Sequence, residues 1–346
     1  MKLKLRDYIT HFDGRHFMFN RNMWSVVLVL LLGLAMTTTL LAQAKLAQTG
    51  FEFLSVPLDA RASAMGDAYT TVEGVSNNLF YNPAGIASIT SYVDLAANYF
   101  DFIADIKYMS FSLAINPWQG QYGVFGLSLE TIDYGEVEGT MVWANPQGFV
   151  DTEILEPKAI AMGLGYGKTL SDKFLVGGQV RWVSQQLGKS VIPGESAAKR
   201  NVTDALSFDF GTIYRTGFKS LSFGMSVRNF SQEIKFEEEG FQLPLTFKIG
   251  FSINALDFTN MNPDQHAFLL VLDAVHPRSY PEYINFGGEY TFMKMFSLRG
   301  GYISNKDEYK LTAGFGVSQF GLKIDYAYMP WENFDTVHRF TIRFSY

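Results

Sequence analysis

Charged side chains of both signs recur at alternate positions from residue 181 onward, on the opposite face of each segment from large apolar residues. Acids and bases that share a face can form ion pairs, hold an internal segment, or bind the polar group of a ligand. A network that only ties a wall to a plug is favoured over a transport or ligand-binding role. The candidate residues are Arg181, Asp209, Arg228, Lys248, Asp273, Glu289, Arg299, Lys310, Lys323, Asp325, Arg339 and Arg343.

Catalytic chemistry is poorly supported by the residue types and their spacing. His266, His276 and His338 lack the spacing of metal ligands, and no Ser lies in a G-x-S-x-G elbow. The alternate glycines of 163–167 are followed by no helical pattern, which argues against a dinucleotide-binding loop. We therefore predict neither an enzyme nor a cofactor or metal.

The composition is typical of a membrane barrel. The 346 residues are 47% hydrophobic, 16% aromatic and 18% charged, and mean hydropathy is +0.03. Soluble domains carry about 25% charged residues, and disordered chains are poor in aromatic residues. The absence of Cys excludes a disulfide-stapled module and a lipoprotein anchor. A transmembrane barrel places apolar and polar residues at alternate positions, so its average hydropathy is near zero.

Alternation also defines the elements that must position the charges. In 244–256, large apolar residues at odd positions alternate with polar or small residues at even positions. Such segments have the length of a transmembrane strand, about 9–11 residues. We predict an all-β, 14-stranded antiparallel transmembrane barrel over 92–346. Its strands are expected near 92–100, 105–116, 121–131, 157–170, 173–187, 204–214, 219–230, 244–256, 266–275, 283–292, 295–304, 309–319, 321–329 and 337–346.

The lengths of the connections give a second indication of a barrel. An even number of strands puts both chain ends in the periplasm and the long connections outside. Most inner connections are tight, although 257–265 is long, and the outer connection 101–104 is short. The long outer connections are expected at 132–156, 188–203, 231–243 and 330–336. The last segment alternates up to Tyr346, as in the final strand of outer-membrane barrels.

Residues 1–44 are predicted to be a signal peptide. A basic start precedes a run of 20 uncharged residues, Met23–Ala42, and Ala42-Gln43-Ala44 forms an A-x-A cleavage pattern. A retained transmembrane anchor is the alternative. Removing 1–44 takes five basic and two acidic side chains from totals of 28 and 34, which leaves a net charge of −9. That charge argues against nucleic acid as a partner.

Residues 45–91 lack the pattern of a strand and have the size of a plug inside the barrel. Asp59 is expected to cap a short helix that ends at Gly66, and the segment from Asn82 to Gly85 marks a fixed turn. Small inward residues leave room in the barrel for a plug or a ligand. Among the inward acids, we expect Glu289 to pair with Arg61.

The same segment carries a resemblance to a known family. Arg61-Ala62-x-Ala64-Met65-Gly66-x-Ala68, followed by Asn82-Pro83-Ala84-Gly85, resembles the N-terminus of the PorV/PorQ family of outer-membrane proteins. That family is similar to the FadL-type transporters of long-chain fatty acids. Gly287–Tyr290 and Leu298–Tyr302 resemble the family's late strands, so the resemblance spans nearly the whole mature chain. It implies a FadL-like barrel with an N-terminal hatch, whose motif residues are Arg61, Met65, Gly66, Asn82, Pro83, Ala84 and Gly85.

The resemblance implies two possible functions in the outer membrane of a diderm bacterium. PorV-like proteins accompany the type IX secretion translocon, accept the C-terminal signal domain of its cargo and pass it to a surface-attachment complex. FadL-like proteins carry hydrophobic small molecules through the outer membrane. We predict the secretion role, or a related surface-export role, and keep hydrophobic transport, with a ligand in the lumen, as the alternative. The chain is shorter than the better-known PorV proteins, which weakens the cargo role.

Overall fold

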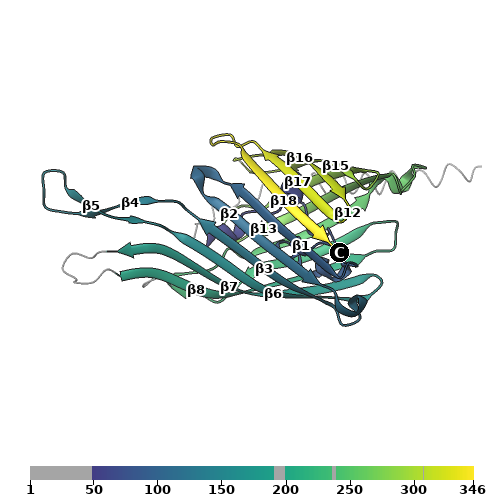
Figure 1. Cartoon of the computed structure of the whole chain (residues 1–346), viewed down its shortest axis with the longest axis horizontal. Helices are drawn as coiled ribbons and strands as arrows, with labels where there is room; N and C mark the ends of the chain where they lie inside the picture. The colour runs from purple at the N-terminus through teal and green to yellow at the C-terminus, as the bar shows by residue number, and fades with distance from the viewer. Residues whose placement is uncertain (1–48, 191–198, 236–238, 307) are drawn as a thin grey trace, which may run out of the picture. The chain divides into compact units, whose positions relative to one another are not determined.

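A computed structural model describes residues 49–190, 199–235, 239–306 and 308–346 (Figure 1). The predicted signal peptide, 1–44, lies outside these residues. Within the described ranges, no helix is both long enough and apolar enough to cross a membrane.

Fourteen strands in the described part of the chain form one closed antiparallel barrel, as predicted (Figure 1). Neighbours in the chain are neighbours in the wall, and β1 closes the barrel by pairing with β18, with Ala97 opposite Ile342. The barrel strands are β1 (Val93–Asp101), β2 (Lys107–Ile115), β3 (Val124–Asp133), β6 (Lys158–Ser171), β7 (Phe174–Ser190), β8 (Lys199–Arg215), β9 (Ser222–Phe230), β12 (Thr246–Asn254), β13 (His266–Pro277), β14 (Tyr283–Phe292), β15 (Phe296–Ile303), β16 (Leu311–Gln319), β17 (Leu322–Met329) and β18 (Val337–Ser345).

The predicted alternation decides which side chains face out. On β12, Phe251 is exposed, whereas Lys248 and Ser252 are buried inside the barrel. On β8, Phe210 is exposed and Asp209 is completely buried. Successive side chains of a strand point to opposite faces, so one register fixes the whole pattern.

Connections alternate between two ends of the barrel, which we call the loop end and the turn end. The turn end carries the connections before β9 and after β16, and the backbone of Tyr346 forms hydrogen bonds there with the backbone of Val93. Short helices lie in three connections, η4 (Ile103–Asp105) at the loop end and η5 (Pro117–Gly120) and η6 (Ala255–Phe258) at the turn end.

 In full, the turn end carries the connections after β2, β6, β8, β12, β14 and β16, and the loop end carries those after β1, β3, β7, β9, β13, β15 and β17.

Two of the predicted long loops contain more strand than expected. Instead of a loop over 188–203, β7 runs on to Ser190 and β8 begins at Lys199, because the two strands keep pairing beyond their other neighbours. The expected loop 132–156 holds a hairpin of β4 (Val137–Val142) and β5 (Phe149–Leu155), which projects at the loop end (Figure 1). A smaller pair, β10 (Ile234–Lys235) and β11 (Gly240–Phe241), lies in the connection after β9.

The segment before β1 fills the interior of the barrel, the lumen, as a hatch of short helices. These are η1 (Glu52–Ser55), α2 (Ala60–Ala64), η2 (Ser76–Phe80) and η3 (Pro83–Ser88). The hatch begins at the loop end, where Thr49 forms a bridge with Gln242, and it ends at the turn end, where β1 begins. Thr49 and Tyr346 therefore lie at opposite ends of the barrel. The hatch therefore crosses the lumen once from the loop end to the turn end before the first strand begins.

Small residues on the inner wall make room for this hatch. A Cβ on Gly177 would lie 2.4 Å from the carbonyl carbon of Pro83, and one on Gly167 would lie 2.6 Å from Ile86. Both glycines belong to the period-2 pattern of small inward residues on β6 and β7. The space that the small inward residues leave inside the barrel is therefore filled by the hatch.

Candidate functional site

The helix α2 positions the first motif residue. The Asp59 carboxylate accepts a hydrogen bond from the Arg61 amide at 2.7 Å, which is the expected N-terminal cap. The helix ends at Ala64 with Met65 as its C-terminal cap. Gly66 follows with a φ of +63° and donates its amide hydrogen to the Thr312 hydroxyl at 3.0 Å. The cap and the left-handed glycine therefore fix both ends of a helix of only five residues.

Arg61 enters a chain of alternating charges that runs from the hatch into the wall. Its Nε and Nη2 donate to the two oxygens of Glu289 at 2.8 and 2.6 Å, so the predicted partner of Arg61 is confirmed. Arg299 donates to the same carboxylate at 2.5 Å, and its Nη1 lies 2.8 Å from Asp325. This series of charges joins α2 to β14, β15 and β17. The pair of Arg61 and Glu289 has the two-pronged geometry that makes arginine–carboxylate pairs strong.

A second charge network lies on the wall formed by β7, β8 and β9. The Nε of Arg181 is 2.9 Å from Asp209, and both side chains are buried. The amide of Asn229 donates to the other oxygen of Asp209 at 2.7 Å. Glu130 on β3 is also buried. Glu130 was not predicted, although it shares a face with Ser128 in the expected strand 121–131, and this alternation was a usable signal.

Asp273 on β13 attaches the middle of the hatch. Its Oδ2 accepts hydrogen bonds from the amides of Tyr69 and Thr70 at 2.8 and 3.0 Å, and from the Thr70 hydroxyl at 2.7 Å. Because the carboxylate is completely buried, these bonds compensate for its removal from water. The expected inward position of Asp273 is thereby explained by a contact with the hatch backbone.

The remaining predicted charges divide into buried and exposed groups. Arg228, Lys248 and Arg339 are buried inside the barrel, and the guanidinium of Arg339 lies 4.0 Å from the ring centre of Phe100. Lys323 and Arg343 are partly exposed. The prediction for Lys310 was wrong: it is exposed and precedes β16, because that strand begins at Leu311 rather than at 309.

The Asn82-Pro83-Ala84-Gly85 turn is tied to the hatch and to the wall. The side-chain oxygen of Asn82 accepts from the Ala84 amide at 3.1 Å, and its nitrogen donates to the carbonyls of Thr70 and Thr212 at 2.7 and 3.2 Å. Pro83 begins η3, where its fixed φ suits a first helical position. There is no room for a Cβ at Gly85, because it would lie 2.4 Å from the side-chain nitrogen of Asn78.

An aromatic cluster lies in the lumen toward the loop end. We call residues 49–58 the strap. Phe51, Phe53 and Leu54 of the strap are buried in a cluster that also contains Phe100, Tyr108 and Tyr309. Phe100 and Tyr108 stack with ring centres 4.9 Å apart, and Tyr309 packs against Trp331 at 4.8 Å. This cluster was not predicted, since its members come from distant strands.

Metal-binding chemistry has no obvious location in the part of the chain described by the structure. No group of three or more His, Cys, Asp or Glu residues there is placed to hold a metal ion.

Comparisons with known proteins define the class of fold. No protein-family model matches this chain, and no curated protein matches it. Among solved structures, the chain is similar to a monoaromatic hydrocarbon channel, CymD, with a TM-score of 0.56, 13% identity, and coverage of 84% of this chain and 98% of that one. It is also similar to the toluene transporter TbuX of Ralstonia pickettii, with a TM-score of 0.54, 13% identity and coverage of 83% and 98%.

A third similar structure is a FadL homologue of Pseudomonas aeruginosa, with a TM-score of 0.52, 12% identity and coverage of 84% of this chain and 99% of that one. At these identities the similarities establish the fold. The described part of the chain has the fold of a closed, antiparallel, 14-stranded barrel of the FadL-like type. The PorV/PorQ resemblance stays a prediction from the sequence motifs.

Proposed function

We propose that this protein is an integral outer-membrane barrel that carries hydrophobic small molecules across the membrane. The observation that carries the proposal is the lumen. A closed wall surrounds an aromatic cluster at the loop end, and a hatch held by discrete polar contacts closes the path to the turn end. The shared fold with two proteins described as hydrocarbon or toluene transporters supports the same class of substrate.

The chemistry of the lumen suits an apolar, preferably aromatic, compound. Rings of Phe100, Tyr108 and Trp331 can contact such a compound face-on or edge-on. To pass on to the turn end, the compound must displace the strap and then the hatch contacts at Asp273 and Asn82. Movement of the Asn82 turn is thus part of the proposal.

Toluene uptake tests the proposal directly. Cells that express the protein are expected to accumulate radiolabelled toluene faster than cells that lack it. Equal uptake by the two strains at low toluene concentration would contradict a transport function.

A reversible lock tests the role of the hatch separately. The hydroxyls of Ser76 in the hatch and Ser112 in the wall lie 2.9 Å apart, and the chain has no Cys of its own. In the variant Ser76→Cys/Ser112→Cys, we expect oxidation to block uptake and a reductant to restore it, whereas each single variant behaves as wild type. Uptake that is unchanged in the oxidised variant would show that passage does not require this part of the hatch to move.

A protein-partner role in type IX secretion, or in a related surface-export assembly, is the second candidate. The β4–β5 hairpin at the loop end supports it, because Val142, Trp143 and Phe149 are exposed there by 83%, 53% and 45%. Exposed apolar side chains on a projecting hairpin can contact a partner protein. Affinity purification from detergent-extracted outer membranes should then recover a translocon or a cargo signal domain with the intact protein, and lose it on deletion of 137–155. Recovery of the barrel alone in both cases would count against this role.

A further inference from the structure

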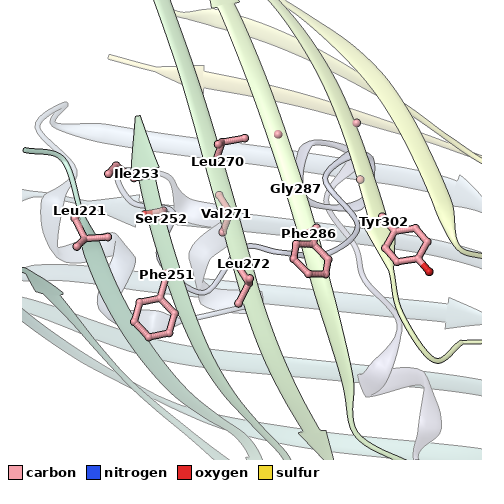
Figure 2. Close-up of a pocket in the computed structure, with 13 residues that line it drawn as sticks. Leu221, Phe251, Ser252, Ile253, Leu270, Val271, Leu272, Phe286, Gly287 and Tyr302 are labelled. Carbon is pink, nitrogen blue, oxygen red and sulfur yellow. The ribbon is translucent and has the colours of Figure 1, made fainter. Parts of the chain in front are cut away.

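The outward face of the barrel has an apolar hollow across β12 to β15 (Figure 2). Its volume is about 560 Å³, within the range of small-molecule sites. Phe251, Leu270, Phe286 and Tyr302 line its sides, and Leu221 lies at its far edge. The hollow lies on the face of the wall opposite the hatch.

Two outward glycines form part of this lining. Gly288 and Gly300 face each other across β14 and β15. Internal packing does not require glycine at either position: a Cβ on Gly300 would meet nothing closer than 4.0 Å, and one on Gly288 would meet Phe268 at 3.4 Å. Neither residue has a positive φ. What the two glycines provide is open space on the outside of the wall.

Their neighbours have a different role. Gly287 and Gly301 face inward, and a Cβ there would lie 2.6 Å from the Met65 carbonyl oxygen and 2.1 Å from the Gly66 nitrogen. The close approach of the hatch explains these two glycines. The hatch does not explain why positions 288 and 300, which face outward, are glycines.

We propose that the hollow is a binding site for one acyl chain of a membrane phospholipid. It opens on a face crowded with exposed apolar side chains, including Leu298 on β15 and Phe315 on the adjoining β16, so its surroundings in a membrane are hydrocarbon. It crosses three inter-strand spacings of about 4.8 Å, roughly 14 Å in all, and this elongated apolar form suits a chain. The proposal depends on membrane insertion but not on transport.

Photocrosslinking in defined vesicles tests this site. The probe is phosphatidylethanolamine that carries a diazirine in one acyl chain, and the protein is the full mature barrel. Crosslinks are expected to concentrate in peptides from β13, β14 and β15. In Gly288→Leu/Gly300→Leu, side chains fill the hollow, and we expect crosslinking there to fall about tenfold, the effect of losing contact with about two methylenes.

The matched control is Gly178→Leu on β7, where an added Cβ would also meet only ordinary contacts, the nearest at 3.5 Å. It should leave crosslinking at β13–β15 unchanged. Heat-modifiable migration of each variant separates failed folding or insertion from failed lipid binding. Crosslinks spread evenly over all strands, or equal in the double variant, would overturn the proposal. So would crosslinks between two copies of the protein through this face, which would identify a protein interface.

Discussion

Glu289 accepts hydrogen bonds from two guanidinium groups, one in the hatch and one in the wall. Replacing it with glutamine leaves Arg61 and Arg299 without their shared counter-charge in a buried place. We expect Glu289→Gln to lower the free energy of unfolding by about 3 kcal/mol. Equilibrium unfolding in urea from lipid vesicles measures this change.

The exposed Lys310 offers a control for the same measurement. Lys310→Gln removes a charge outside the network and should change the free energy of unfolding by no more than about 0.5 kcal/mol. Similar values for Glu289→Gln and Lys310→Gln would mean that the network contributes little to holding the hatch.

Glu52 gives the strap a dependence on pH. Burial raises the pKa of the Glu52 carboxyl above its ordinary value, although hydrogen bonds from Thr49 and Ser279 oppose the shift. The Glu52 carboxyl therefore stays protonated to a higher pH in the folded strap than in the unfolded strap. As pH rises from about 4 through the folded pKa, the contribution of Glu52 to strap stability falls.

Hydrogen exchange at the Gly50 amide, which donates to the Gln242 carbonyl, measures that change. After correction for intrinsic exchange, its protection should decrease as the pH rises above about 4. In Glu52→Gln the decrease should disappear. An equal decrease in both proteins would assign the effect to another group.

At the scale of elements, substitution of two adjacent glycines on β15 is expected to change the stability of the barrel by different amounts. Gly301→Ala places a methyl group against the Gly66 nitrogen, and overpacking should cost about 1–3 kcal/mol of stability. Gly300→Ala adds a methyl group to open space and should change stability by no more than about 0.5 kcal/mol. Thermal or urea unfolding of the two variants compares them. A larger effect at 300 than at 301 would contradict the placement of the hatch.

The elements themselves were largely predictable from the sequence. Period-2 alternation depends only on which face of a strand meets the lumen, so it located β14 at its observed bounds, Tyr283–Phe292. The capped helix at Asp59 and its left-handed Gly66 follow from local chemistry. The pairing of Arg61 with Glu289 was a choice among the four inward acids predicted from alternation, and no local signal in the sequence singled Glu289 out.

What the sequence could not reveal depends on register between distant segments. The aromatic cluster around Phe100 draws on β1, β2 and the connections at the loop end, and no local pattern joins them. The outward hollow exists because Gly288 and Gly300 happen to be opposite, a fact that only strand pairing fixes. Lys310 was misplaced because the start of a strand has a weaker signal than its middle.

For the whole molecule, closure depends on the last strand. β18 pairs with β17 on one side and with β1 on the other. Deletion of 337–346 exposes two unpaired edges, so we expect no folded, heat-modifiable band on gels. Deletion of 137–155 removes a hairpin outside the closed wall and should retain that band. A folded band from the shorter chain would show that the barrel can close without β18.

The path of the hatch sets an order for assembly. The chain enters the lumen beside Gln242 at one end and leaves it at Val93 at the other, so the wall encircles a segment that passes right through it. A ring that is already closed could acquire such a segment only if residues upstream of Thr49 were drawn through it. The economical sequence of events is that the hatch lies against the inner faces of the strands while the sheet is still open. The joining of β1 to β18 is then the last step, and it encloses the hatch.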